Sequence, residues 1–321
     1  MTTPILTPVK IVYFGSGAFG LPTLRALARA HTIRAIVTQP DRPAGRGGRL
    51  TPTPVGEWAA SEAPGLPLFK PEKVNLPEIR DAVRAHDADA WVVIAFGQKL
   101  SAALLADRFA VNLHASLLPR WRGAAPINAA MVAGDAEIGN SVITLADRMD
   151  AGLILGQSSR PVEPTQTMGE LHDLLAEDGA PLVLEVLARH AAGTLSPHPQ
   201  DESQVTLAPR LSKADGRVDF ADQAARCRAR INGLSPWPGV TVGFRGEPLK
   251  VLRADSQSDE REAPPGVLLD AAQGLVRCAP GTALRVLEVQ PPGKRVMPWA
   301  DFARGRKVEN GEALHASPDT K

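Results

Sequence analysis

Short apolar runs alternate with amphipathic stretches along the first part of the chain. The stretches with helical spacing are residues 19–30 and 171–190. The apolar runs that have the length of strands are residues 10–14, 33–37, 90–95, 110–113 and 141–145. Strands that alternate with helices are typical of a parallel sheet whose two faces are both covered by helices. We therefore predict an α/β domain over residues 1–190, built on a Rossmann-like, mostly parallel sheet.

The pattern changes after residue 190. Residues 191–209 are rich in Pro, Ser, Thr and Gln and show little periodicity, so we predict a linker there. The pattern over residues 219–231 favours a helix. Gly and Pro then separate further short apolar runs, at residues 240–244, 249–252, 266–269, 275–278 and 283–287. Such a series predicts a small, OB-like antiparallel β-barrel over residues 210–321.

The composition is that of a soluble globular protein with two domains. The chain has 321 residues, of which 44% are hydrophobic and 22% charged. No run approaches the roughly 20 apolar residues that a membrane helix needs, and the N-terminus lacks a secretion signal. The two cysteines, Cys227 and Cys278, are far apart in the sequence, which argues against a disulfide framework and suits a reducing cytoplasm. We expect a cytoplasmic monomer with no membrane partner.

A net charge of +1 hides an uneven distribution of charge. Residues 210–321 hold 18 Lys and Arg against 14 Asp and Glu, whereas acids outnumber bases in the rest of the chain. A basic cluster can neutralise the phosphates of a nucleic acid, although a solvated surface is the other interpretation. The cationic residues of this cluster are Lys294, Arg295, Arg304, Arg306 and Lys307.

Residues 15–20, Gly-Ser-Gly-Ala-Phe-Gly, match the glycine spacing of a dinucleotide fingerprint. They follow a predicted strand and precede a predicted helix, so a nicotinamide oxidoreductase is a rival hypothesis. The fingerprint also needs an acidic residue about 20 positions later to hold the ribose. Residues 37–39 are Val-Thr-Gln, and Asp41 comes only after them. Because glycines also occur where a chain turns tightly, we interpret the motif as a turn and expect no NAD.

A group of polar residues follows the predicted strand at 110–113. Asn112 and His114 are two positions apart, so the period of a strand directs both to the same side of the sheet. Ligands of open α/β sheets bind beyond the carboxyl ends of the strands. Asp150 comes after the apolar run at 141–145, which could bring it to the same edge. Each residue alone is typical of a turn, a cap or a structural group, but together they predict a site.

Residues 112–119, Asn-Leu-His-Ala-Ser-Leu-Leu-Pro, resemble the folate-dependent formyltransferases, which share this string and a later Asp beside a Gly. The resemblance implies that Asn112, His114 and Asp150 are catalytic. It also implies a set of folate-binding residues, in the loop after this strand and in the strand and turn that line the pterin pocket. These are Ser116, Leu117, Leu118, Pro119, Val93, Ile94, Ala95, Phe96 and Gly97.

Further stretches resemble the members of that family that act on methionyl-tRNA. They are residues 38–47, 120–126, 211–213, 235–238 and 290–294, and the resemblance covers nearly the whole chain. It implies formyl transfer from 10-formyltetrahydrofolate to the α-amino group of initiator methionyl-tRNA, for translation initiation, without a metal. The arginine-bearing loop and the C-terminal domain would bind the tRNA. The residues implied in tRNA binding are Arg42, Arg46, Arg49, Lys294, Arg295 and Arg304.

Formyl transfer passes through a tetrahedral intermediate with an oxyanion and a cationic nitrogen. The Asn112 carboxamide and a protonated His114 are suited to stabilise the oxyanion, and Asp150 to accept the proton of the amine.

The sequence departs from the family pattern in three places. Residues 15–17 are Gly-Ser-Gly where Gly-Thr-Pro is usual, Phe96 replaces a frequent Tyr, and Asp150 precedes Ala151 where a Thr is usual. The last change also occurs in sugar-nucleotide formyltransferases. A sugar-nucleotide or glycinamide ribonucleotide formyltransferase, or a formyltetrahydrofolate hydrolase, therefore stays an alternative. A non-catalytic RNA-binding protein is a further alternative, but it would not need Asn112, His114 and Asp150 together.

Overall fold

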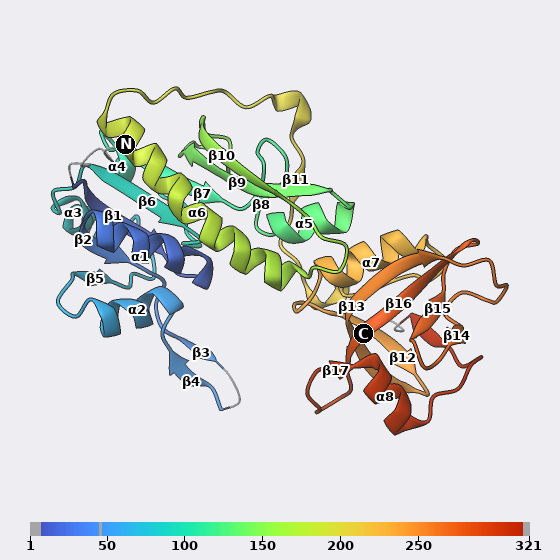
Figure 1. The fold of residues 1–321 in the computed structure, drawn as a ribbon. Helices are drawn as coiled ribbons and strands as arrows, with labels where there is room; N and C mark the ends of the chain where they lie inside the picture. Colours follow the sequence, from blue (N-terminus) through green and yellow to red (C-terminus); the bar gives the residue numbers. More distant parts are fainter. Residues whose placement is uncertain (1–7, 45–46, 317–321) are drawn as a thin grey trace. The chain divides into compact units, whose positions relative to one another are not determined.

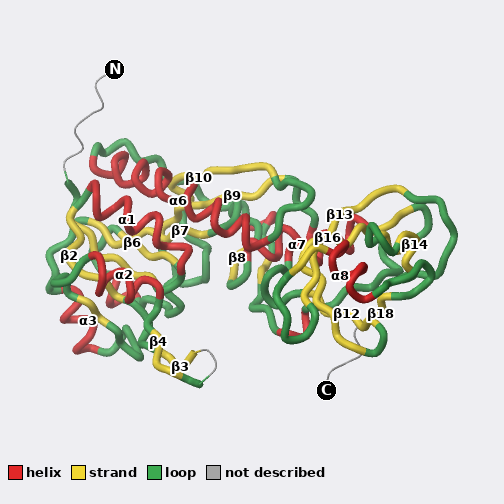
Figure 2. Tube along the Cα trace, turned by 60° about the horizontal axis from the view of Figure 1, so that its bottom comes forward, coloured by secondary structure: helices red, strands yellow, loops and turns green. Residues whose placement is uncertain are grey.

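The computed structural model describes residues 8–44 and 47–316, and the contacts within the chain form two compact units. The first unit comprises Met1–Arg122, Gly139–Ser159 and Asp173–Thr206. The second comprises Gly123–Ile138, Arg160–His172 and Leu207–Lys321. Helices alternate with strands in the first unit, whereas strands and loops dominate the second (Figure 2). None of the helices in the described part of the chain is long and apolar enough to cross a membrane.

The first unit is built on a seven-stranded sheet with the order β10-β9-β7-β6-β1-β2-β5 (Figure 1). The neighbours from β7 to β5 pair in parallel, and β9 pairs with β7 antiparallel. The prediction of a mostly parallel sheet is therefore confirmed. The strands are β1 (Lys10–Gly15), β2 (Thr32–Val37), β5 (Leu68–Phe69), β6 (Ala90–Ile94), β7 (Ala110–His114), β9 (Glu137–Thr144) and β10 (Ile154–Pro161).

Helices cover both faces of this sheet. On one face, Phe14 and Trp91 pack in a core that also contains residues of α3 and α4. On the other face lie α1 and α6, and the Asn140 side chain of β9 donates a hydrogen bond to the carbonyl of Leu175 in α6, at 2.8 Å. The helices of this unit are α1 (Leu21–Ala30), α2 (Pro54–Glu62), α3 (Pro77–Arg84), α4 (Ala102–Leu105) and most of α6 (Met168–Ala191).

The glycine-rich turn between β1 and α1 encloses a tyrosine ring. The Tyr13 hydroxyl donates a hydrogen bond to the carbonyl of Gly20, at 3.0 Å, and the ring is fully buried. A Cβ atom on Gly15 would lie 2.6 Å from this ring, and one on Gly20 would lie 2.1 Å from its hydroxyl. The glycines at both ends of the motif are thus needed to make room for Tyr13, which agrees with its interpretation as a turn.

A short hairpin projects from the first unit, within the arginine-bearing loop predicted from the sequence (Figure 1). Its strands, β3 (Arg42–Ala44) and β4 (Arg49–Thr51), pair antiparallel. Two ion pairs anchor its base, between Arg42 and Glu72 at 2.5 Å and between Asp41 and Lys70 at 2.6 Å. The arginine-bearing loop thus contains a short hairpin, which was not predicted because a three-residue strand is too short to show an alternating pattern in the sequence.

The second unit contains an antiparallel sheet that curls back on itself. Its order is β14-β15-β16-β13-β12-β18, with β17 paired to β16. Backbone hydrogen bonds join the chain around the two end strands, from Leu268 to Glu312 at 2.7 Å and from Leu314 to Gly266 at 2.8 Å. The prediction of a small β-barrel is confirmed in this curled form. The strands are β12 (Val240–Phe244), β13 (Glu247–Ser258), β14 (Leu268–Asp270), β15 (Leu275–Arg277), β16 (Thr282–Gln290), β17 (Met297–Pro298) and β18 (Leu314–Ala316).

Helices pack on this curled sheet and complete its core. The helix expected over 219–231 begins later, as α7 (Ala224–Gly233), and α8 (Trp299–Arg306) has no counterpart among the predicted elements. Cys227 and Cys278 are both buried in this core as thiols, with 3.9 Å between their sulfur atoms. The remaining elements are β8 (Arg122–Gly123), α5 (Pro126–Ala133), β11 (Leu207–Ala208) and three 3-10 turns, η1 (Ala18–Gly20), η2 (Glu202–Gln204) and η3 (Lys213–Asp215).

Candidate active site

The end of β7 carries two of the three residues predicted to be catalytic. Asn112 lies opposite Val93 of β6, and His114 lies opposite Ser141 of β9. The Asn112 side chain is half-buried, and within the described residues its carboxamide has no hydrogen-bond partner. Its N–H and C=O groups are therefore free to bind a ligand at the carboxyl end of the sheet.

His114 lies beside Asp150. The His114 Nδ1 atom is 3.7 Å from a carboxylate oxygen of Asp150, and the two side chains are only 8% and 14% exposed. On the other side of the ring, Nε2 is 2.9 Å from the carbonyl oxygen of Trp121. A carbonyl can only accept a hydrogen bond, so Nε2 carries a proton and donates it. This contact orients the ring and turns Nδ1 towards Asp150.

Asp150 reaches His114 through a loop rather than through the strand before it. Since β9 runs antiparallel to β7, its end at Thr144 lies opposite Val111, away from His114. The loop between β9 and β10 then carries Asp150 back. Asp150 has a φ of +54°, a left-handed conformation that Asp adopts more readily than most residues. The structure thus brings His114 and Asp150 together, with Asn112 two residues away on the same strand.

A residue from the predicted linker holds this loop. The Gln200 Nε2 atom donates hydrogen bonds to the carbonyls of Asp150, at 2.7 Å, and of Gly152, at 2.8 Å. Its carbonyl oxygen in turn accepts hydrogen bonds from Arg122. Gln200 was not among the predicted site residues, because it lies in a stretch without periodicity and far along the chain from Asp150.

The loop after β7 contains the residues expected to bind folate, and much of its polar surface is used internally. The Ser116 hydroxyl donates to the carbonyl of Arg120 at 2.7 Å, and the Ser116 carbonyl accepts from the Ser141 hydroxyl at 2.7 Å. Ser116 and Leu118 are buried, whereas Leu117 and Pro119 are half-buried. Ser116 therefore shapes the loop.

The turn after β6 presents backbone rather than side chains. Val93 is buried like the strand's last residue, Ile94, whereas Ala95 and Gly97 are exposed and have positive φ values of 46° and 85°. Between them, the Phe96 ring points into the core, where it packs edge-on against Phe14 at 5.6 Å. The Phe96 position thus contributes its ring to the core, and the Ala95 and Gly97 backbone lines the surface.

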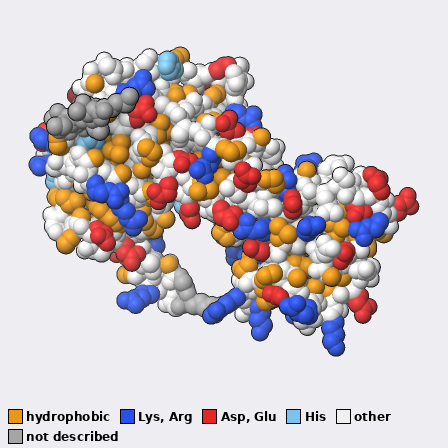
Figure 3. Space-filling view, viewed as in Figure 1, with side chains coloured by type: hydrophobic (Ala, Val, Ile, Leu, Met, Phe, Trp, Pro, Cys, Tyr) orange, Lys and Arg blue, Asp and Glu red, His pale blue; other side chains and the backbone are white. Residues whose placement is uncertain are grey.

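The cations expected to bind tRNA lie in both units. Arg42 is paired with Glu72 and Arg49 is exposed, while Arg46 lies outside the described residues. In the second unit Lys294 and Arg295 are exposed, and Arg304 pairs with Asp301. Lys and Arg side chains gather over β17 and α8 on the face shown in Figure 3.

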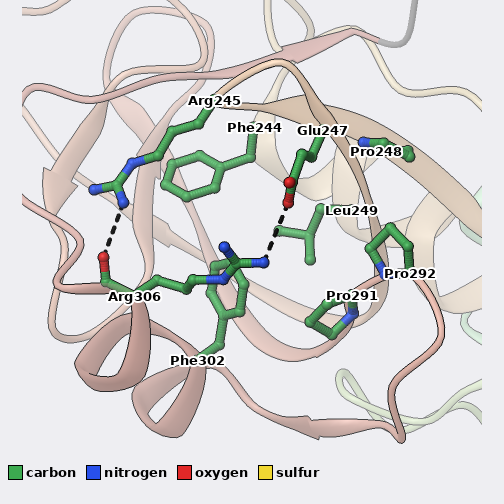
Figure 4. Close-up of a pocket in the computed structure, with 9 residues that line it drawn as sticks. All are labelled: Phe244, Arg245, Glu247, Pro248, Leu249, Pro291, Pro292, Phe302 and Arg306. Atoms are coloured by element: carbon green, nitrogen blue, oxygen red, sulfur yellow. Dashed lines mark hydrogen bonds and ion pairs between the residues drawn. The ribbon is translucent and has the colours of Figure 1, made fainter.

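A pocket of about 250 Å³ opens in the second unit between the β12–β13 turn and α8 (Figure 4). Its two arginines are already engaged. Arg245 pairs with Glu312 at 2.6 Å, and Arg306 pairs with Glu247 at 3.1 Å. The aromatic rings in its wall belong to the core of this unit. Nowhere among residues 8–44 and 47–316 do three or more His, Cys, Asp or Glu residues form a group that could hold a metal ion.

Both units match known families. The model of the formyl transferase family matches residues 9–187, and that of the formyl transferase C-terminal domain matches residues 210–307. A methionyl-tRNA formyltransferase from Methylococcus capsulatus is 43% identical over 298 residues, which cover 92% of this chain and 96% of that protein. One from Roseiflexus castenholzii is 41% identical over 312 residues, covering 95% and 99%. The chain belongs to the methionyl-tRNA formyltransferase family.

Solved structures share the fold at much lower identity. WlaRD, a sugar 3N-formyl transferase, has a TM-score of 0.65 at 12% identity and covers 90% of this chain and 100% of its own. HypX from Aquifex aeolicus, solved with tetrahydrofolic acid, has a TM-score of 0.63 at 15% identity and covers 95% of this chain and 49% of its own. Such identities establish the fold alone, whereas the methionyl-tRNA formyltransferase relatives are similar in sequence over both units.

Proposed function

We propose that this protein transfers the formyl group of 10-formyltetrahydrofolate to the α-amino group of initiator methionyl-tRNA, and that it acts as a cytoplasmic monomer. The main support for this chemistry is the pair of His114 and Asp150, with 3.7 Å between Nδ1 and a carboxylate oxygen. On the same strand as His114, the Asn112 carboxamide has no hydrogen-bond partner among the described residues. Family membership at more than 40% identity supports the choice of acceptor. Residues 1–190 would be catalytic, 191–209 would connect the domains, and 210–321 would bind tRNA.

The first step is attack of the methionyl amine on the formyl carbon of the donor. This forms a carbon–nitrogen bond and places negative charge on the former carbonyl oxygen. The Asn112 N–H groups supply hydrogen-bond donors that stabilise this oxyanion. A protonated His114 adds a further donor at Nδ1, since Nε2 is bound to Trp121. Donors fixed before the reaction are effective because they need no reorganisation as the charge develops.

The second requirement is removal of a proton from the amine nitrogen, which becomes cationic on attack. Asp150 accepts this proton, directly or through a water molecule. The bond between the formyl carbon and the folate nitrogen then breaks, and that nitrogen receives a proton as it leaves. His114 Nδ1, next to Asp150, is placed to hold a proton during this exchange, while Nε2 stays bound to Trp121.

The folate donor would bind beside Asn112, between the turn after β6 and the loop after β7. The exposed backbone of Ala95 and Gly97 offers amide and carbonyl groups to a flat pterin ring, and Val93 is paired with Asn112 across the strands. The half-buried Leu117 and Pro119 offer an apolar surface on the other side. These features fit a flat, largely aromatic ligand with polar edges.

The tRNA would be held by cations on two surfaces. Arg42 and Arg49 belong to the hairpin of the first unit, and Arg46 lies between them in the sequence. The three would contact the acceptor end, where arginine side chains suit phosphates and base edges. Lys294, Arg295 and Arg304 would contact the backbone of the tRNA body. Backbone contacts position a nucleic acid but carry little sequence information.

The test is to incubate the protein with labelled 10-formyltetrahydrofolate and one of two acceptors, charged initiator tRNA or an amino-sugar nucleotide. We expect label to appear on the methionyl amine and to be lost in His114→Ala. Transfer to the sugar nucleotide alone, or release of free formate in the absence of any acceptor, would refute the proposed function in favour of an alternative named above.

A further inference from the structure

The segment that joins the two predicted domains reaches into the candidate active site from the side of Asp150. Gln200 is half-buried, and its two N–H bonds are both used, one on the carbonyl of Asp150 and one on the carbonyl of Gly152. These two carbonyls belong to Asp150, whose left-handed backbone conformation directs its carboxylate to His114, and to the glycine two positions after it. A single side chain thus fixes the backbone at the proposed base and just after it.

Gln200 is itself held by a buried arginine. Arg122, which is only 6% exposed, donates to the Gln200 carbonyl oxygen through Nε at 3.0 Å and Nη2 at 2.7 Å. The two donors lock the orientation of the amide, so that its N–H side must face Asp150. Arg122 also pairs with Glu202 at 2.9 Å, and Glu202 pairs with Arg148 of the Asp150 loop at 3.0 Å.

The same segment holds the other side of the pair. The Thr206 hydroxyl accepts a hydrogen bond from the Trp121 amide at 2.9 Å, and the Thr206 carbonyl accepts one from the Arg122 amide at 2.9 Å. Trp121 has a φ of +63°, and its carbonyl orients the His114 ring. Gln200 and Thr206 therefore support both members of the pair, Gln200 through the carbonyls of Asp150 and Gly152 and Thr206 through the backbone amide of Trp121.

We infer that Gln200 is a positioning residue for formyl transfer, which sets Asp150 against His114 by holding the carbonyls of Asp150 and Gly152. The inference rests on the proposed function of the trio. Gln200 binds backbone carbonyls and would touch no reacting atom. Its effect is on geometry, and errors of about 1 Å in the placement of a catalytic group can lower a rate by as much as roughly a hundredfold.

The experiment compares two substitutions at Gln200 with a matched control. Gln200→Ala removes the whole side-chain amide, whereas Gln200→Glu keeps the length and the acceptor for Arg122 but removes both N–H donors. The control is Gln204→Ala, which removes an exposed glutamine of the same segment whose amide donates to the Asp201 carboxylate. We expect both Gln200 variants to lower kcat about ten- to a hundredfold, with KM for both substrates unchanged, and the control to behave as the unaltered protein.

A second background separates positioning from general damage. In Asp150→Asn protein, Gln200→Glu should cause no further loss of kcat, because the group that it positions no longer accepts a proton. An equal loss in both backgrounds, or a rise in KM with kcat unchanged, would overturn the inference. Gln200→Glu preserves the packing and is used for this comparison if Gln200→Ala fails to fold.

A readout without substrate distinguishes failure of this inference from failure of the proposed function. The NMR signals of the His114 ring, assigned by their loss in His114→Gln, should shift in Gln200→Glu and stay in place in Gln204→Ala. If the unaltered protein does not formylate methionyl-tRNA, the proposed function fails while this measurement still reports on positioning. Unchanged His114 signals in Gln200→Glu would refute the positioning role whatever the substrate.

Discussion

The two units use their polar groups in different ways. In the first, a few directed hydrogen bonds converge on the carbonyls around one histidine and one aspartate, and the side chains concerned are largely buried. In the second, the cations near β17 and α8 are exposed, and Arg304 is paired with its neighbour Asp301. Removal of one directed contact should disturb the geometry of the reacting centre. Removal of one exposed charge should weaken tRNA binding only in part, because the remaining charges still attract the phosphates. Single substitutions should therefore be decisive in the first unit and graded in the second.

The largest effect is expected at the trio. Alanine at Asn112, His114 or Asp150 should lower kcat by at least about a hundredfold, the usual scale for an oxyanion donor or a general base. His315→Ala, at an exposed histidine of β18, serves as the control. Steady-state kinetics on charged initiator tRNA test this.

Double variants test whether these residues act as a unit, because the effects of substitutions within such a unit are not additive. A double variant of His114 and Asp150 should lose little more activity than the worse single variant. Losses that multiply would mean that the two groups act independently, and the first unit would then resemble the second.

Substitution of a buried side-chain amide in the second unit should have the opposite effect, since it should lower stability without lowering the rate of formyl transfer. The Asn232 side chain of α7 donates to the carbonyl of Ala254 and accepts from its amide, both at 2.9 Å, so that it ties α7 to β13. Asn232→Ala should lower the free energy of unfolding by roughly 1–3 kcal/mol, because it leaves buried backbone groups without partners. Urea denaturation measures this, and kcat of the folded protein should stay the same. A lower kcat in fully folded Asn232→Ala protein would contradict the assignment of catalysis to the first unit alone.

Graded behaviour is expected of the exposed cations. Replacing Lys294, Arg295 and Arg304 together by alanine should weaken initiator and elongator tRNA alike. It should also reduce the dependence of binding on salt, by about one unit of the log–log slope for each phosphate that is no longer neutralised. Arg226→Ala, on the exposed side of α7, is the control. Loss of the preference for initiator tRNA in the triple variant would show that this surface reads sequence, which would contradict the purely electrostatic role given to these cations.

The smallest effect concerns one ion pair on the second unit. The Arg253 guanidinium, hydrogen-bonded at 2.8 and 3.0 Å, lowers the pKa of Glu170 to about 2. A lowered pKa means that the pair stabilises the fold above the ordinary glutamate pKa of about 4.3 and loses this contribution as the pH falls towards 2.

Because the Glu170 side chain is 45% exposed, screening keeps the contribution below about 1 kcal/mol. Glu170→Gln should thus be slightly less stable at pH 7, and the difference should vanish near pH 2. Thermal melts across this range check it, and a difference that grew on acidification would reverse the assignment.

The parts of the fold that could be predicted from the sequence are those whose hydrophobic residues recur with the period of a helix or form an apolar run of strand length. The strands around residues 12, 92 and 112 are apolar runs between breaks, and a parallel sheet covered by helices follows from their alternation with amphipathic stretches. The linkage of Gln200 to Asp150 could not be predicted, since it joins two irregular segments 50 residues apart by contacts to backbone carbonyls. The orientation of the Phe96 ring could not be predicted either, because a residue between two neighbours with positive φ can direct its ring to either face of the sheet.

The tyrosine enclosed by the turn after β1 has a consequence for the annotation of genomes. A pattern search that scores only the spacing of Gly15, Gly17 and Gly20 would assign this turn to the nucleotide-binding proteins. Yet Gly15 and Gly20 leave room for the ring of Tyr13, two positions before the first glycine, and Tyr13 closes the turn through its hydroxyl. We expect that a bulky aromatic at that position identifies, in other chains with the same spacing, turns whose glycines accommodate a side chain of the protein itself.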